Sequence, residues 1–236
     1  MLNFYTHNVS FLKEKSKPCG KSIEDRVHLV NAAFPLEAPI YTPKIHLTAT
    51  EKKYSKLKTY DKPVVMFGVL GSTPQKSMPY EYIVALIDYV TTHFEVYILF
   101  NYAPDQKVEA TKIYNACKHQ DAIIFDVYEA SIRGFIALMN QCQLLIANEG
   151  GIVHIAKALD KPTFTIFSPY VIKSHWASFE DGELHTSVHL LDQNPDLFST
   201  SREDRKKIEE NPSFFYEQLT PKLILEKLSP FLKHHI

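Results

Sequence analysis

The stretch LLIANEGGIVHIAKALDKPTFTIFSP, residues 144–169, determines the fold that we expect for this chain. It opens with an apolar run at 144–147 and continues through two adjacent glycines, Gly150 and Gly151. Apolar residues then recur at intervals of three and four, which is the spacing of one helix face. A second apolar, β-rich run follows at 163–167. The stretch therefore predicts a parallel strand–helix–strand unit with a glycine turn between the first strand and the helix.

The glycine turn is the first candidate binding site. Two glycines where a strand passes into a helix let a ligand approach the backbone closely. The free N–H groups of the first helical turn favour an anion such as phosphate, and His154 is near enough in sequence to add a hydrogen bond. Glu149 precedes the same helix end, where the dipole stabilises a carboxylate with or without a ligand. The alternative is a turn in which the glycines only pack and His154 is a surface residue.

The composition is that of an ordinary globular protein. Of the 236 residues, 45% are hydrophobic and 22% are charged, which is enough chain for one sizeable core. The net charge of −1 and the scattered Lys and Arg give no reason to expect nucleic acid as a partner. The three cysteines lack CxxC spacing and indicate free thiols in a reducing compartment. Without a signal-peptide core or a transmembrane run, the expected location is the cytoplasm. The scattered histidines predict no metal site, and no cofactor is expected.

Strands and helices alternate from Lys62 onward. Apolar β-rich runs predict strands, and amphipathic segments predict the helices between them. The expected strands are 64–69, 96–100, 122–125, 144–147, 163–167 and 188–191, and the first three helices are 80–92, 106–118 and 131–142. The alternation predicts an α/β fold, a Rossmann-like doubly wound parallel sheet of about six strands. Ligands of such folds bind at the carboxyl ends of the strands, near the point where strand order reverses.

The two ends of the chain differ from this central region, which we place at 62–192. Residues 1–61 are expected to form a connector without a core of its own. It should hold a helix capped by Ser22, a proline-rich segment, and a short helix from Thr50 through Leu57.

Residues 193–236 are expected to pack on the central region as C-terminal helices. The predicted helices are 202–210 and 221–233, separated by Pro212 and an aromatic pair. The second of them has an apolar face that needs a surface to cover.

The loop after the first expected strand is the second candidate binding site. Its sequence GSTPQKSMP supplies the hydroxyls of Ser72 and Thr73 and the cation of Lys76, groups that make charge-assisted hydrogen bonds to phosphate. Gln75 replaces the glycine that a P-loop needs before its lysine, and Pro74 removes a backbone donor, which argues against an ATPase. The alternative is that Lys76 is a solvated loop lysine.

Two further loops contain candidate residues. Asp105, after the second expected strand, either accepts a hydrogen bond from a ribose hydroxyl, as acidic residues do in dinucleotide folds, or caps the helix that begins at Gln106. We expect the cap. The loop at 170–187 either covers a base, binds sugar hydroxyls or only packs, through the side chains of Tyr170, Lys173, His175 and Trp176.

Together, GSTPQKSMP and NEGGIVHIAKALDKPTFTIFSP make the chain resemble the bacterial lipopolysaccharide heptosyltransferase family of GT-B glycosyltransferases. The donor-binding half of that family has a glycine-and-hydroxyl loop followed by a lysine, matched here by Gly71, Ser72 and Lys76. It also has an acidic-Ser/Thr-Gly-x-x-His turn, which corresponds here to Glu149, Gly150, Gly151 and His154. Gly150 takes the place of the family's Ser or Thr, so the hydroxyl that the family places on the phosphates is absent.

The resemblance implies a metal-independent transfer of a sugar, heptose by family expectation, from a nucleotide-sugar to a lipopolysaccharide-type acceptor. With the loops above, the candidate donor-binding residues are Ser72, Thr73, Lys76, Asp105, Glu149, Gly150, Gly151 and His154. A GT-B enzyme has two Rossmann-like halves, and the family's N-terminal half binds the acceptor and carries the general base.

This chain has the length of one half, which resembles the C-terminal, donor-binding half. We therefore expect a truncated enzyme, or an N-terminal half supplied from elsewhere, and little or no transfer by the chain alone. The expected location is cytoplasmic or peripheral at the inner membrane. The alternatives are a non-catalytic nucleotide- or sugar-binding module, a different α/β enzyme such as an epimerase of GT-B architecture, and a structural role.

Overall fold

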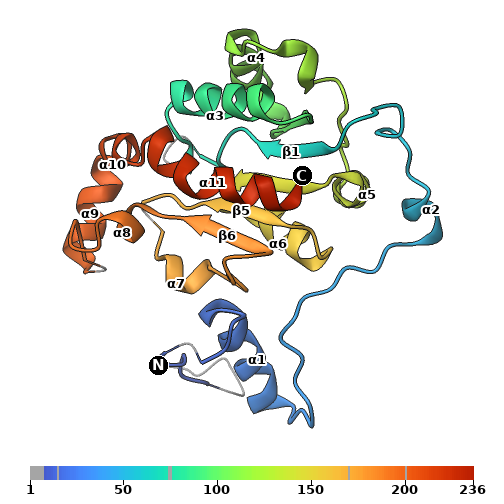
Figure 1. The fold of residues 1–236 in the computed structure, drawn as a ribbon. Helices are drawn as coiled ribbons and strands as arrows, with labels where there is room; N and C mark the ends of the chain where they lie inside the picture. The colour runs from blue at the N-terminus through green and yellow to red at the C-terminus, as the bar shows by residue number, and fades with distance from the viewer. Residues whose placement is uncertain (1–7, 15, 74–75, 170, 200) are drawn as a thin grey trace.

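The computed structural model describes residues 8–14, 16–73, 76–169, 171–199 and 201–236. Its parallel strands form one sheet in the order β3–β2–β1–β4–β5–β6 (Figure 1). Chain order reverses at β1, which pairs with β2 on one side and β4 on the other. The strands are β1 (Val64–Gly68), β2 (Tyr97–Asn101), β3 (Ile123–Ile124), β4 (Leu144–Asn148), β5 (Thr163–Ile166) and β6 (His185–Val188). The predicted doubly wound α/β fold is confirmed.

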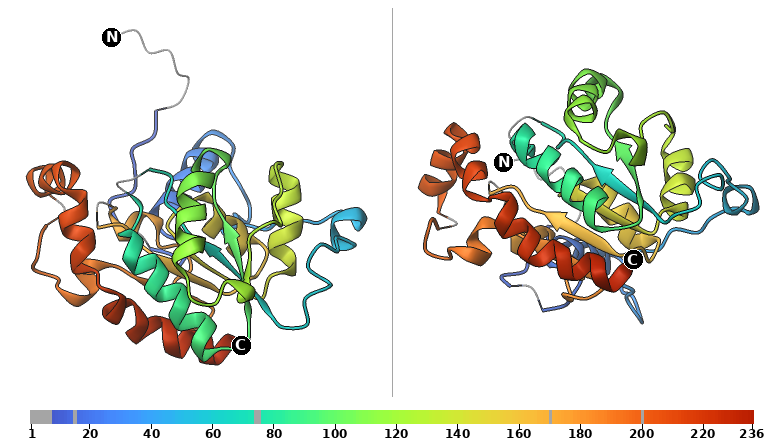
Figure 2. Two further views of the ribbon diagram at one scale, coloured as in Figure 1. Left: turned by 90° about the horizontal axis from the view of Figure 1, so that it is seen from above. Right: turned by 45° about the horizontal axis from the view of Figure 1, so that its top comes forward.

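Helices cover both faces of the sheet (Figure 2). One layer contains α3 (Tyr80–His93), α4 (Lys107–Ala116) and α11 (Pro221–His235), and the other contains α5 (Ile132–Gln141) and α6 (Gly151–Ala158). Successive side chains of a strand point to opposite faces, so β1 and β4 supply both cores. Both strands are buried along their whole length, which explains why they appear in the sequence as continuous apolar runs.

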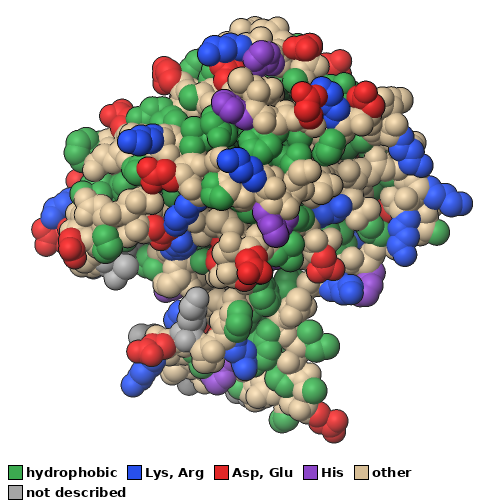
Figure 3. Space-filling model, viewed as in Figure 1, with side chains coloured by type: hydrophobic (Ala, Val, Ile, Leu, Met, Phe, Trp, Pro, Cys, Tyr) green, Lys and Arg blue, Asp and Glu red, His purple; other side chains and the backbone are tan. Residues whose placement is uncertain are grey.

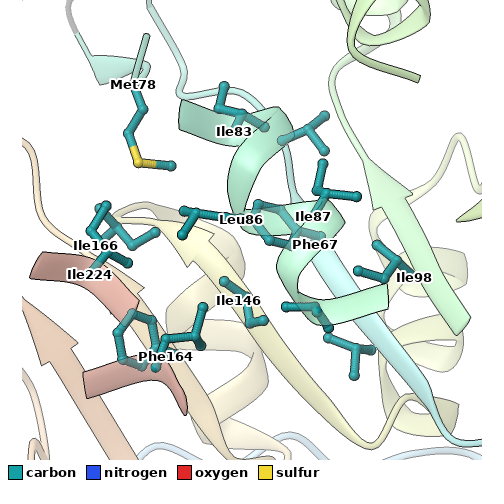
Figure 4. Packing of buried hydrophobic residues seen from close by; sticks show 14 of the residues in the cluster. Phe67, Met78, Ile83, Leu86, Ile87, Ile98, Ile146, Phe164, Ile166 and Ile224 are labelled. Atoms are coloured by element: carbon teal, nitrogen blue, oxygen red, sulfur yellow. The ribbon is translucent and has the colours of Figure 1, made fainter. Parts of the chain in front are cut away.

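The larger core lies between the sheet, α3 and α11 (Figure 4). Its fully buried members include Phe67, Ile146 and Phe164 from the strands, Leu86 and Ile87 from α3, and Ile224 from α11. Burying one such side chain contributes about 1.5–3 kcal/mol. This packing fixes the strands, and with them the loops that leave their carboxyl ends.

Most central elements begin and end within about two residues of their predicted bounds, but β6 does not. We expected 188–191, whereas the strand is His185–Val188. It begins early because buried His185 pairs with Thr163 on β5, with 3.0 Å between ring Nδ1 and hydroxyl oxygen. It ends at Val188 because the ring of His189 accepts the N–H of Leu191 and starts the short helix α8 (Leu190–Gln193).

The C-terminal segment contains α9 (Arg202–Glu210) and α11, as predicted, and an unexpected α10 (Pro212–Gln218). We expected Pro212 to separate helices, but it occupies the first turn of α10, where a missing N–H and a fixed φ suit a helix. Tyr216 of α10 is buried in the larger core. The apolar face of α11 packs on β5 and β6 of the sheet.

The N-terminal segment contains α1 (Lys21–Ala33) and α2 (Ala49–Lys52). Ser22 does not cap α1, because the helix begins earlier, after Gly20, which provides no side-chain bond. Thr50 does not cap α2 either. Thr48 does so, because its hydroxyl accepts the N–H of Glu51 and the Glu51 carboxylate accepts the N–H of Thr48. That reciprocal pair requires an acid three residues after the cap, which Thr48 has in Glu51. The helix ends at Lys52, before the predicted end at Leu57.

α1 packs against α7 (Lys173–Trp176), a short helix within the loop that follows β5. The segment around its start is tied to the residues after α7, since the N–H of Phe179 donates to the carbonyl of Pro18 over 2.6 Å. Figure 1 shows α1 below the sheet and joined to β1 by a long connector that passes α2. The described part of the N-terminal segment therefore contacts the central region at α7, and it also contacts α5 through α2.

Candidate functional site

The loops that follow β1 and β4 meet at the switch point of the sheet. These strands are hydrogen-bonded neighbours, so their carboxyl ends lie side by side. The β4 loop contains Glu149, Gly150 and Gly151, and the β1 loop contains Ser72 and Lys76. Ligands of open α/β sheets bind at such a point. The two stretches that drew attention in the sequence are therefore brought together.

The Gly150–Gly151 turn presents an open backbone. Gly150 is the N-cap residue of α6 with an extended conformation (φ 163°, ψ −176°), and its helix end has no side-chain cap. The first N–H groups of a helix have no partner one turn earlier within it. In α6 the N–H of Val153 donates to the carbonyl of Gly150 over 3.2 Å, which leaves the N–H groups of Gly151 and Ile152 as those that can face a ligand. A Cβ built on either glycine would meet no atom of the described residues within 4 Å. Those residues therefore leave space beside the backbone, as close approach of an anion requires.

Several buried polar atoms around this turn lack a hydrogen-bond partner within the described part of the chain. They are both side-chain amide atoms of Asn148, Oε1 of Glu149 and the hydroxyl of Thr165. Asn148 is 4% exposed and Thr165 is 1% exposed. A buried polar group without a partner costs about 1–3 kcal/mol, and such groups are uncommon in native proteins. A polar ligand bound at the turn would give them partners.

Glu149 is held in place through one carboxylate oxygen. The N–H of Ser168, just beyond β5, donates to its Oε2 over 2.8 Å. Burial raises the pKa of Glu149 to about 7, because desolvation outweighs the Ser168 hydrogen bond and the nearby Lys76 charge. At neutral pH the carboxyl is therefore divided between its protonated and ionised forms.

The β1 loop is closed on itself around Ser77. The N–H of Gly71 donates to the Ser77 hydroxyl over 2.9 Å, and that hydroxyl donates to the carbonyl of Thr73 over 3.1 Å. The phenol of Tyr216 donates to the carbonyl of Lys76 over 3.2 Å. These bonds hold the backbone of Lys76 at the edge of the site. Pro74 and Gln75, the two residues that argued against a P-loop in the sequence, lie outside the described residues.

Gly71→Ala is expected to open this loop. A Cβ at Gly71 would lie 2.1 Å from the carbonyl oxygen of Lys76, a backbone atom, so the loop must shift. We expect the free energy of unfolding in urea to fall by about 1–3 kcal/mol and the affinity of the site for an anionic ligand to fall about tenfold or more as Lys76 is displaced. Gly151→Ala is the stability control, since its Cβ meets no atom. Equal stability of the two variants would contradict the conclusion that close packing of Gly71 against the Lys76 carbonyl holds this loop closed.

Two cavities open on either side of the turn, and both are lined by Ser72, Glu149, Gly150 and Gly151. The first, here called the tyrosine cavity, has a volume of about 590 Å³ and extends toward the ends of β2 and β3. The second, called the histidine cavity, has a volume of about 610 Å³ and extends toward the end of β5 and α7. A ligand lying across the turn could therefore place one group in each cavity.

The tyrosine cavity is lined by Tyr102, Asp105 and Tyr128. The rings of Tyr102 and Tyr128 are stacked with 6.3 Å between centroids, and Tyr102 also stacks on Phe125 at 5.5 Å. Stacked, partly exposed aromatic rings offer a flat surface to another ring system. Asp105 does not cap α4, because the N-cap residue is Gln106, so the preferred prediction for Asp105 was wrong. Asp105 instead lines the tyrosine cavity.

The histidine cavity is lined by Lys76, His154, His175 and Trp176, over an apolar floor that includes Phe167. The rings of His154 and Trp176 lie 6.4 Å apart. Burial lowers the pKa of His154, and the charges of Lys157 and Arg26 lower it further. The imidazole is therefore neutral at pH 7 and offers one donor and one acceptor. Tyr170, also noted in this loop, lies outside the described residues.

Most of the candidate residues lie at this edge of the sheet, together with residues that the sequence did not single out. Ser72, Lys76, Asp105, Glu149, Gly150, Gly151 and His154 all line one or both cavities. Thr73 does not; it lines an adjacent cavity of about 530 Å³, which Ser72 and Asp105 also line. Tyr102, Tyr128, Asn148 and Thr165 were not singled out. Position directly after a strand was a usable signal for Tyr102, but the lack of partners at Asn148 and Thr165 appears only in three dimensions.

Another cavity in the described part of the chain is less suited to an anion. It measures about 720 Å³ and lies between β6 and α11. Its two lysines, Lys173 and Lys227, already share the carboxylate of Asp192 at 2.7 and 3.0 Å. Glu183 and Glu226 add negative charge to its wall. We therefore assign the candidate site to the switch point.

The described residues contain no group of three or more His, Cys, Asp or Glu side chains that could hold a metal ion. His185 and His189 are four residues apart, a spacing that would place two ligands on one helix face. They lie instead in and just after β6, where one ring bonds Thr163 and the other bonds Leu191. All three cysteines are buried free thiols.

A parallel sheet with an open helix N-terminus at its switch point defines a Rossmann-like α/β domain of the kind that binds ligands at this edge. The family model for glycosyltransferase family 9 (heptosyltransferase) matches residues 6–174. The match covers well over half of the chain, so the chain belongs to glycosyltransferase family 9.

Solved structures share this fold. The glycosyl transferase family 9 structure from Veillonella parvula DSM 2008 is 13% identical, with a TM-score of 0.67 over 86% of this chain and 58% of that chain. E. coli heptosyltransferase WaaC with ADP is 14% identical, with a TM-score of 0.64 over 97% of this chain and 60% of that chain. E. coli ADP-heptose lps heptosyltransferase II is 16% identical, with a TM-score of 0.60 over 84% and 56%.

At such identities the similarity shows the fold alone, which is one half of the GT-B fold of heptosyltransferases. The chain spans slightly more than half the length of these proteins. No curated protein sequence matches the chain. Within the described ranges, the helices are too short or too polar for any of them to cross a membrane.

Proposed function

We propose that this chain is the donor-binding half of a metal-independent glycosyltransferase. It would bind a nucleotide-sugar for transfer of the sugar, heptose by family membership, to a lipopolysaccharide-type acceptor in the cytoplasm or at the inner membrane. The observation that carries the proposal is the open Gly150–Gly151 turn, with Lys76 beside it and partnerless buried polar atoms around it. WaaC has been solved with ADP and with ADP-2-deoxy-2-fluoro heptose, which supports a nucleotide-sugar as the ligand class.

The shape of the site supports one orientation of the donor. The diphosphate would lie over the N-terminus of α6, where the backbone N–H groups and the Lys76 ammonium favour negative charge. The nucleoside would enter the tyrosine cavity, with its base on Tyr102 or Tyr128 and a ribose hydroxyl donating to Asp105. The sugar would point into the histidine cavity, toward His154, His175 and Trp176.

The same groups would assist the chemistry. When the glycosidic bond breaks, negative charge grows on the departing diphosphate. Fixed donors aimed at that charge stabilise the transition state more than the ground state. Lys76 and the α6 N–H groups would supply this stabilisation, while neutral His154 would hold a phosphate or sugar oxygen. The general base and the acceptor site would come from the N-terminal half.

Exposed apolar side chains support a partner for the N-terminal segment. Figure 3 shows hydrophobic side chains gathered on the lower lobe that α1 forms. In and after this helix the exposed apolar residues are Leu29, Val30, Phe34, Leu36 and Ile40. Contiguous apolar surface of this kind is typical of an interaction site. An acceptor-binding half placed there would adjoin α7 and the histidine cavity, because α1 packs on α7.

Lys76→Ala is expected to weaken nucleotide-sugar binding about 10- to 100-fold, because it removes a charge-assisted contact worth about 1.5–3 kcal/mol. His154→Ala should weaken it less, since a neutral hydrogen bond is lost. The measurement is calorimetric titration with ADP, UDP and GDP sugars. Lys58→Ala is the control, because Lys58 is exposed in the segment that leads to the opposite end of β1. Equal affinities of all four proteins, or no binding by the folded wild type, would overturn the donor-site assignment.

A further inference from the structure

We propose that Glu149 binds the donor diphosphate as a protonated carboxylic acid, so that donor binding takes up a proton. The inference rests on the proposed function, because it needs the diphosphate at the Gly150–Gly151 turn. It assigns to Glu149 the role of a hydrogen-bond donor, which is the reverse of what an acidic side chain ordinarily does.

The geometry places one carboxyl oxygen where the ligand must pass. Oε2 is fixed by the N–H of Ser168 at 2.8 Å, and the backbone N–H of Glu149 is fixed by the carbonyl of Ile166 at 3.2 Å. Oε1 is buried and has no partner within the described residues. The side chain lines both cavities, immediately before the open N–H groups of α6. A phosphoryl oxygen on those N–H groups would therefore lie next to Oε1.

The two ionisation states have opposite effects at this position. An ionised carboxylate beside a diphosphate repels it, and burial makes the repulsion stronger. A protonated carboxyl has one O–H to donate, which would give Oε1 the partner it lacks. Burial already raises the pKa of Glu149 to about 7 in the free protein. A bound anion raises it further, since a like charge nearby disfavours ionisation.

Other charged and titratable groups face Glu149 from each element around it. Lys76 of the β1 loop favours the ionised form, and so does the Ser168 N–H that follows β5. A bound diphosphate would neutralise the Lys76 charge and weaken that effect. Tyr216 of α10 is deeply buried, and burial raises its pKa, so it stays protonated. His154 of α6 and His175 of α7 line the same cavity.

The test measures protons directly. Wild-type protein is titrated calorimetrically with ADP-glucose, UDP-glucose and GDP-mannose at pH 7.5, in buffers that differ in ionisation enthalpy. Each phosphate of these donors carries one ester and one anhydride bond and keeps only a strongly acidic proton site, so the ligand takes up no proton near pH 7. A carboxyl with a free pKa near 7 that becomes fully protonated should take up between about half a proton and one proton. Affinity should fall up to tenfold per pH unit above pH 7.

Two variants separate Glu149 from the histidines. Glu149→Gln keeps a side-chain donor without charge, so it should bind at pH 8.5 at least as tightly as the wild type, without proton uptake or pH dependence. His154→Gln should bind more weakly but still take up the proton. Proton uptake that persists in Glu149→Gln and disappears in His154→Gln would overturn the inference. Loss of binding by a folded Glu149→Gln, checked by thermal unfolding, would show that the ionised carboxylate is needed, and would also overturn it.

A second measurement avoids any dependence on the variants. The ¹³C chemical shift of the Glu149 carboxyl reports its ionisation in the wild type. It should titrate near pH 7 without ligand and remain in the protonated range to above pH 8 with saturating nucleotide-sugar. Binding without proton uptake overturns this inference alone. No binding of any nucleotide-sugar overturns the proposed function and this inference with it.

Discussion

Gly150→Val is expected to abolish nucleotide-sugar binding while leaving the fold intact. The extended backbone at Gly150 suits any residue, and a Cβ there meets no atom within 4 Å. A valine should therefore change the free energy of unfolding by less than about 1 kcal/mol. Its branched side chain would occupy the space that a diphosphate needs beside the α6 N–H groups. We expect affinity to fall about 100-fold or more, a loss of about 3 kcal/mol.

The measurement pairs calorimetric titration with urea unfolding of the same preparation. Gly150→Ala, with one carbon added, should lose affinity by a smaller factor at unchanged stability, so that the loss grows with side-chain size. If Gly150→Val binds the donor within about threefold of the wild type, the diphosphate does not lie over this turn. If Gly150→Val unfolds, residue 150 must be small for the protein to pack, and the loss of binding would say nothing for a ligand site there.

Lys157→Met is expected to produce a large loss of stability. Lys157 lies on α6 with its side chain 2% exposed, and its ammonium donates to Oε1 of Glu180 over 2.6 Å and to the carbonyl of Ser178. Methionine preserves much of the apolar packing but leaves the Glu180 carboxylate, 13% exposed, without its cation. Removing one partner of a buried ion pair costs about 3–5 kcal/mol. Equilibrium unfolding in urea should show a loss of that size at pH 7.

The double variant Lys157→Met, Glu180→Gln is the control. Removing both charges should restore a large part of the lost stability, because the cost comes from the uncompensated carboxylate. A loss below about 1 kcal/mol in the single variant would mean that the pair acts as an exposed salt bridge. Glu180 follows α7, so the single variant should also loosen the wall that bears Trp176. Its nucleotide affinity should fall while that of the double variant recovers.

The parallel sheet could be predicted because its strands are buried on both faces. Burial from both sides requires continuous apolar runs, and Val64–Gly68 and Leu144–Asn148 are such runs. β6 was misplaced because three of its four residues are polar. His185 and Ser187 belong to the strand only because the protein around them supplies partners, such as Thr163 for His185. No local pattern in the sequence contains that information.

The candidate site was predictable in its two loops but not in its walls. Glycines after a strand and a lysine near hydroxyls indicate phosphate chemistry wherever they occur, so Lys76 and Gly150 were recognised. The tyrosine cavity is built from the loops after β2 and β3, and Tyr102 meets Tyr128 only once those strands are paired. The role of Asp105 was misjudged because helix capping is the commoner use of an aspartate at a helix start.

The most direct test of the donor site is an amide NMR titration of the ¹⁵N-labelled chain with the nucleotide-sugar that binds best in calorimetry. If the diphosphate lies over the turn, the backbone amides of Gly150 and Gly151 should show the largest saturable shifts. The amides of residues that line the tyrosine and histidine cavities should show smaller shifts that saturate with the same dissociation constant. Shifts confined to the cavity between β6 and α11, around His185 and Lys227, or an unchanged spectrum from a folded chain, would contradict a donor-binding site at the switch point.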